Sequence, residues 1–100
     1  MKEKTVEAYL HERVTALGGG TRKWVSPGHN GVPDRIVMWP SGDKGPFYTR
    51  IHYVETKAPR GVLRVRQARE HKALKKLGCI VLTIYTIEQV DNYVRNYELR

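Results

Sequence analysis

Apolar residues recur at intervals of three and four along three stretches of the chain, and this spacing predicts three helices. The first covers residues 3–17 and is ended by the glycines at 18–20. The second covers residues 64–77, and the third begins after a capping-box sequence at residues 86–89. The expected core positions are Val6, Leu10, Val14 and Leu17 in the first helix, Val65, Ala68, Leu74 and Leu77 in the second, and Ile87, Val90, Val94 and Tyr97 in the third.

Shorter stretches rich in apolar and β-branched residues predict strands at residues 21–25, 34–39, 50–57 and 79–85. The last stretch is continuously apolar, which is typical of a central strand covered on both faces. Turn-forming residues at 40–46 favour a meander of the first three strands. A parallel, right-handed crossover is expected between the third and fourth. The order α-β-β-β-α-β-α therefore predicts an α/β fold with a mixed central sheet flanked by helices.

Length and composition restrict the class of protein. One hundred residues with a hydrophobic fraction of 40% predict a single domain, residues 1–100, with a modest core. The single cysteine, Cys79, excludes an internal disulfide and is expected to be a small buried hydrophobe. No apolar stretch approaches the ~20 residues of a membrane span, and no signal-peptide core follows the N-terminus. A reducing, intracellular and cytoplasmic setting is expected.

The charge of the chain is strongly positive. Lysine and arginine number 18 against 10 aspartates and glutamates, which gives a formal net charge of +8. Such an excess favours a polyanionic partner, most simply nucleic acid. A basic, solvated surface is the plain alternative, and charge alone does not decide between the two.

Two short charged segments stand at the edges of the second and third predicted strands. Gly31-Val32-Pro33-Asp34 leads into one strand, and Glu55-Thr56-Lys57 closes the next. Strand side chains alternate between the two faces, so Glu55 and Lys57 point to the same face. Antiparallel pairing of the two strands would bring Asp34 beside them. We therefore predict a site at which two carboxylates and one ammonium group converge.

These side chains suit the hydrolysis of a phosphodiester assisted by a hard divalent cation. Mg²⁺ prefers oxygen ligands and usually keeps several waters, so one or two carboxylates suffice to bind it. Asp34 and Glu55 would be those carboxylates, with the main-chain carbonyl of Thr56 as a third ligand. Lys57 would stabilise the attacking hydroxide or the charge that develops on the phosphate. The alternative is an ordinary Glu–Lys pair on an exposed strand face.

With these motifs the chain resembles the PD-(D/E)xK nuclease superfamily and, more narrowly, the VRR-NUC family and its small stand-alone members of phage type. The resemblance runs from about residue 3 to about residue 85. It rests on Gly31-Val32-Pro33-Asp34-Arg35, Glu55-Thr56-Lys57, Glu7 in the first predicted helix, and Gln67 in the second. It implies a restriction-endonuclease-like core.

The resemblance also implies roles for individual residues. One Mg²⁺ or Mn²⁺ would be held by Asp34, Glu55 and the main chain of Thr56, with Lys57 as the catalytic lysine. From its position alone, Glu7 is either a solvated flank of the buried stripe or a side chain facing the same cleft as Asp34. The resemblance implies that Glu7 is the helical acid that supports metal or water placement. It implies that Gln67, a surface residue by spacing alone, orients water or phosphate.

The stand-alone members of this family resemble structure-selective endonucleases that act on four-way DNA junctions as homodimers. We therefore expect a Holliday junction resolvase of DNA recombination and repair, in a bacterium or the bacterial host of a phage. The dimer surface could include the tail from Tyr93 to Arg100 or residues 40–48. The alternatives are a flap or less selective DNA nuclease, or a non-catalytic basic module. The last would lack a ligand, and none is missing.

Basic residues gather after the site and along the second predicted helix. Contacts with DNA phosphates are expected from Arg60, Arg64, Arg66, Arg69 and Lys72, with Lys75 and Lys76 further along. A solvated helix face is the alternative.

The remaining polar and aromatic residues give weaker signals. Arg35 is expected to point away from the site and pair with an acid, and His29 could touch substrate from the loop at residues 26–33. Trp24 and Trp39 are expected to pack in the core or at an interface. Stacking on bases is the alternative, although no aromatic series predicts a single-strand platform.

Overall fold

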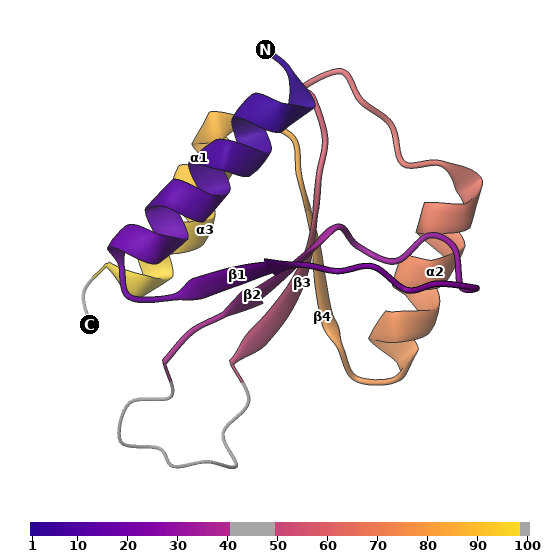
Figure 1. Cartoon of the computed structure of the whole chain (residues 1–100). Coiled ribbons are helices and arrows are strands. Elements are labelled where there is room, and N and C mark those ends of the chain that lie inside the picture. Colours follow the sequence, from indigo (N-terminus) through magenta and orange to yellow (C-terminus); the bar gives the residue numbers. More distant parts are fainter. Residues whose placement is uncertain (41–49, 99–100) are drawn as a thin grey trace.

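A four-stranded mixed sheet with helices on its faces forms the fold of residues 1–40 and 50–98, the part of the chain that a computed structural model describes (Figure 1). The elements are α1 (Glu3–Ala16), β1 (Gly20–Lys23), β2 (Arg35–Met38), β3 (Ile51–Thr56), α2 (Val65–Lys76), β4 (Ile80–Ile84), α3 (Ile87–Val94) and the 3-10 helix η2 (Arg95–Tyr97). The predicted order and the α/β class are confirmed. The turn predicted at residues 40–46 lies, after Pro40, outside the described residues.

The strands lie in the order β1-β2-β3-β4. The first three pair antiparallel, as the predicted meander requires, and β3 pairs parallel to β4. The strand predicted to be central, β4, instead lies at an edge of the described sheet, and Ile80 is 49% exposed. The prediction was wrong because β-branched residues suit strand geometry itself, whether or not both faces are covered.

The apolar core lies on the sheet face covered by α1 and α3, which run side by side (Figure 1). Its fully buried apolar side chains come from both helices and from the two inner strands, and include Val6, Leu10, Val14, Val37, Val54, Val90 and Val94. These positions agree with the spacing predicted for the first and last helices. The core therefore anchors α1 against the sheet, which places the N-terminal end of α1 near the end of β3.

The aromatic expectation for Trp39 also holds on this face of the sheet. Trp39 is 6% exposed and stacks on Tyr97, with ring centroids 4.0 Å apart. Its indole Nε1 donates a hydrogen bond to the hydroxyl of Tyr93 at 2.9 Å. Trp39 is thus a core residue that ties α3 and η2 to the sheet.

Helix α2 covers the opposite face. Val54 faces the α1 and α3 core, so its neighbour Glu55 faces the other side, where Gln67 of α2 donates a hydrogen bond to it. In α2, which is described in full, His71 is the buried side chain. Gln67, His71 and Leu74 form the stripe directed at the sheet, and Leu74 is only half-buried.

The core positions predicted for this helix were therefore largely wrong. Val65 is 68% exposed, Leu77 is 80% exposed, and Ala68 is exposed as well. The side of α2 that faces the sheet carries Gln67, which donates a hydrogen bond to Glu55 of β3, and does not carry Val65 or Leu77. Across the described residues, no helix has both the length and the apolar character needed to cross a membrane.

Candidate active site

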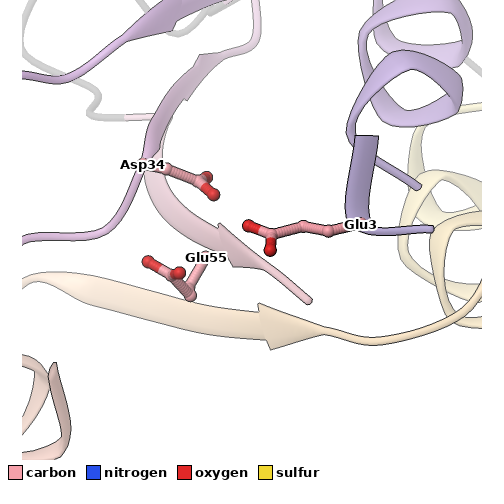
Figure 2. A group of neighbouring side chains, drawn as sticks. All are labelled: Glu3, Asp34 and Glu55. Carbon is pink, nitrogen blue, oxygen red and sulfur yellow. The ribbon is translucent and has the colours of Figure 1, made fainter. Parts of the chain in front are cut away.

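Three carboxylates meet at the end of the sheet where β2 begins and β3 ends. Arg35 pairs with Val54, so the preceding residue, Asp34, lies beside Glu55 on the next strand. Glu3 reaches the same place from the first turn of α1, and Figure 2 shows the three side chains directed toward a common space. Each offers an oxygen within 4.8 Å of the others. We call Glu3, Asp34 and Glu55 the acid cluster.

The side chain of Asp34 is held by one of its two oxygens. Oδ2 accepts hydrogen bonds from the amide nitrogen of Thr56 at 3.2 Å and from the hydroxyl of Thr56 at 3.0 Å. Thr56 is fully buried, which keeps this pair in place. The other oxygen, Oδ1, is buried and has no hydrogen-bond partner among the described residues. It is therefore available to a ligand.

Glu55 repeats this arrangement from β3. It is 3% exposed, and its Oε2 accepts a hydrogen bond from Nε2 of Gln67 at 3.0 Å and lies 3.4 Å from Nζ of Lys57. The amide of Gln67 is oriented by a second contact, because its Oε1 accepts from the backbone nitrogen of Arg64 at 2.9 Å. Within the described residues, Glu55 Oε1 is buried and unpartnered. Asp34 and Glu55 thus each keep one carboxylate oxygen that has no partner among the described residues.

The pKa values of Asp34 and Glu55 indicate that the space between their carboxylates favours a cation. Burial raises the pKa of Asp34 to about 7, and the nearby charge of Glu55 adds to the rise. Burial also raises the pKa of Glu55, although the ammonium group of Lys57 opposes this shift. A positive ion between these oxygens would remove both the repulsion and the cost of burying the charges. The donor set therefore fits a hard divalent metal ion.

The helical acid in the cluster is Glu3, which sequence reasoning did not single out. Glu7, to which that role was assigned, lies one turn later in α1, and its Oε2 is 3.4 Å from Nε of Arg35. Arg35 thus pairs with an acid, as expected. Glu3 and Glu7 are four residues apart and share one helix face, so the spacing points to both. The docking of α1 decides which of the two reaches the strand ends.

A cleft of about 670 Å³ opens over the acid cluster. Its lining comes from the first turn of α1, the end of β1, the loop before β2, the end of β3 and the start of α2. It consists of Glu3, Trp24, Asn30, Gly31, Val32, Asp34, Glu55, Lys57, Arg64, Val65, Arg66 and Gln67. Lys57 and Gln67, both predicted for the site, therefore face the same space as the acids.

The loop that leads to Asp34 is held against α2. Gly31 has a φ of +91°, and a Cβ there would lie 2.4 Å from the backbone oxygen of Arg66. Glycine is required at this position both for the left-handed backbone and for the close approach. In the same loop, Nε2 of His29 lies 2.7 Å from Oε1 of Glu70. His29 thus fastens the loop to α2.

The predicted DNA-contacting residues lie on the outside of the same region. Arg60, Arg64, Arg66, Arg69 and Lys72 are all exposed, and none forms an ion pair with an acid of the described residues. Arg64 and Arg66 belong to the cleft lining. The cleft is therefore acidic at its base and basic at its rim.

Comparisons with known proteins bear on the family of this chain. No family model matches the sequence. The chain is 39% identical over 84 residues to a protein named "Putative nuclease p44" from Acyrthosiphon pisum secondary endosymbiont phage 1, covering 84% of this chain and 83% of that protein. It is similar to a solved structure described as a VRR_NUC domain, with a TM-score of 0.81, 35% identity, and coverage of 97% of this chain and 98% of that one. Together with the restriction-endonuclease-like fold, these likenesses show that the chain belongs to the VRR-NUC family of nucleases.

Proposed function

We propose that this protein is a Mg²⁺- or Mn²⁺-dependent endodeoxyribonuclease that resolves four-way DNA junctions as a homodimer. The observation that carries the proposal is the pair of buried oxygens, Asp34 Oδ1 and Glu55 Oε1, which lack a partner among the described residues. They lie at the base of a cleft whose rim is basic. An anionic substrate and a cation are the partners that such a cleft would take.

The ion would be held by Asp34, Glu55 and Glu3, with the main-chain carbonyl of Thr56 as a further ligand. When bound, it would activate a water molecule and neutralise charge on the scissile phosphate. Thr56 prepares the site by holding Asp34 through Oδ2. Glu7 supports it from outside, because its ion pair with Arg35 ties α1 to β2 beside the acid cluster.

Lys57 and Gln67 would act on the reacting groups directly. The side chain of Lys57 is only 12% exposed, so its ammonium group acts with little screening by solvent. It would stabilise the attacking hydroxide and the negative charge that develops on the phosphate oxygens. Gln67, whose amide orientation is set by the backbone of Arg64, would orient water or a phosphate oxygen beside Glu55.

DNA would be gripped by the two arginines of the cleft lining and by further exposed basic side chains outside it. Arg60, Arg64, Arg66, Arg69 and Lys72 are exposed, and the net charge of +8 would favour any DNA shape. Because charge does not distinguish DNA shapes, the proposed preference for four-way junctions rests on the symmetry of junction resolution. Resolving a junction takes two matched cuts, and a twofold dimer would supply two acid clusters. As the phage origin of the named relative suggests, this would take place inside a bacterial cell.

The decisive experiment compares matched four-way junction, flap, nicked and linear duplex DNA in one cleavage assay. We expect preferential junction cutting with Mg²⁺ or Mn²⁺ and none with Ca²⁺ or EDTA. Lys57→Ala should bind the junction without cutting it, and Lys23→Ala, on the opposite face of the sheet, should cut normally. Equal cutting by Lys57→Ala and the unaltered protein would contradict the catalytic assignment. Preferred cutting of flaps, or equal cutting of all four substrates, would instead support the alternative nucleases.

A further inference from the structure

Trp24 occupies a place in the sheet that its expected packing role does not explain. Its backbone nitrogen donates a hydrogen bond to the carbonyl of Asp34 at 2.9 Å, which continues the β1–β2 pairing one residue beyond Lys23 and Arg35. Paired residues on antiparallel strands point to the same face. Trp24, Asp34 and Glu55 therefore form one row across three strands, on the face that α2 covers.

The indole of Trp24 contacts the ring of Tyr53 and also lines the cleft. Its ring centroid is 5.0 Å from that of Tyr53, at an interplanar angle of 45°. Trp24 is half-buried and lines the cleft, and its Nε1 has no hydrogen-bond partner among the described residues. Trp39 differs in each respect, being buried, stacked on Tyr97 and hydrogen-bonded to Tyr93.

We propose that Trp24 is a stacking subsite for an unpaired nucleobase that flanks the scissile phosphate. The inference rests on the proposed function, since the strand must cross the acid cluster. Neighbouring strands lie about 5 Å apart, so Trp24 stands about 5 Å from Asp34 in the row and about 10 Å from Glu55. One sugar separates a base from its phosphate. A base on Trp24 would therefore leave the attached phosphate over the acids.

The chemistry of the cleft matches both parts of a nucleotide. Beside the acids and the basic residues, Trp24, Val32 and Val65 supply apolar lining, and Val65 is 68% exposed. A base in an intact duplex is stacked on both sides and has no free face to offer. A base at a branch point is easier to unstack, so the subsite would select branched DNA by the cost of extracting the base. Loss of one aromatic–base stack weakens binding by about tenfold.

The test measures binding in Ca²⁺, so that no strand is cut. Junctions would carry either an intact nucleotide or an abasic site at each position flanking the cut. We expect the unaltered protein to lose about tenfold in affinity when the contacted base is removed. Trp24→Leu should bind intact DNA about tenfold more weakly than the unaltered protein does. It should bind abasic DNA with the same affinity as intact DNA. Trp24→Phe, which keeps an aromatic ring, should retain most of the affinity, and Trp39→Phe should keep the full dependence on the base.

A second readout guards against a variant that simply folds poorly. The fluorescence of 2-aminopurine at the same position should fall on binding to the unaltered protein and to Trp39→Phe, and not on binding to Trp24→Leu. The subsite would be overturned if Trp24→Leu lost the same affinity, relative to the unaltered protein, on intact and on abasic DNA. It would also be overturned if Trp24→Leu quenched 2-aminopurine as strongly as the unaltered protein. Absence of any cutting by the unaltered protein with either Mg²⁺ or Mn²⁺ would instead overturn the proposed function. The two failures are thus distinguishable.

Discussion

The two faces of the sheet are built on different principles. The face under α1 and α3 is packed with fully buried valines and leucine, and the helices there follow their apolar spacing. That face also buries the polar side chains of Thr21 and His52, which both pair with Val37 in the sheet. The buried carboxylate of Glu55 and the buried imidazole of His71 lie on the face under α2, and Val65 and Leu77 at the two ends of α2 are exposed. Stability is thus concentrated on one face, which allows the other to hold charges that are costly to bury.

The largest effect should come from deleting apolar volume on the packed face. We expect Leu10→Ala to lower the free energy of unfolding by about 2–5 kcal/mol, because it removes a fully buried side chain and leaves a cavity. Leu77→Ala, at a position 80% exposed on the α2 face, should change it by less than about 0.5 kcal/mol. Urea unfolding of both variants measures the contrast, and similar losses would show that the faces contribute equally.

Gly31→Ala tests how closely the site loop is fitted to α2. The substitution puts a Cβ against the backbone oxygen of Arg66 and strains a left-handed residue, so we expect a loss of about 2–3 kcal/mol together with reduced cleavage. Gly28→Ala in the same loop has a φ of +78° and no atom within 4 Å of its Cβ. It should lose only the backbone contribution, about 1 kcal/mol. Equal losses in thermal unfolding would mean that the close approach to Arg66 contributes nothing.

Substitutions of Glu3 and Glu7 in α1 should distinguish a metal ligand from a residue that supports the site. We expect Glu3→Gln to weaken Mn²⁺ binding by about tenfold, through loss of one carboxylate of the acid cluster. Glu7→Gln should affect Mn²⁺ less, and should lower stability by less than about 1 kcal/mol because its ion pair with Arg35 is partly exposed. Calorimetric titration with Mn²⁺ measures both variants. A larger loss from Glu7→Gln would return the ligand role to Glu7.

A further effect should be electrostatic and visible without metal. Burial and Glu55 raise the pKa of Asp34 to about 7 in the folded protein, above the value of about 4 in an unfolded chain. The folded state therefore holds a proton that the unfolded state releases, so stability in EDTA should fall as pH rises from about 4 to about 7. Asp34→Asn should reduce this fall and be the more stable protein above pH 7. Identical stability profiles against pH would contradict the assignment.

Local patterns determined much of the molecule. Helix spacing identified Val6, Leu10 and Val14 as core residues, because the neighbours of a helical residue are set within one turn. Strand alternation and a short antiparallel pairing placed Asp34 beside Glu55, for the same local reason. The motifs around these two acids also carried the resemblance to the VRR-NUC family, which comparison confirms.

Tertiary structure decided what local periodicity leaves open. It rotated α2 so that His71, and not Val65 or Leu77, faces the sheet, and it left β4 at the edge of the described strands. It also chose Glu3 over Glu7 for the acid cluster. Periodicity defines which residues share a face. The rotation of a helix about its axis and its shift along the sheet depend on contacts between residues that are distant in the sequence. These contacts form only when the whole chain packs.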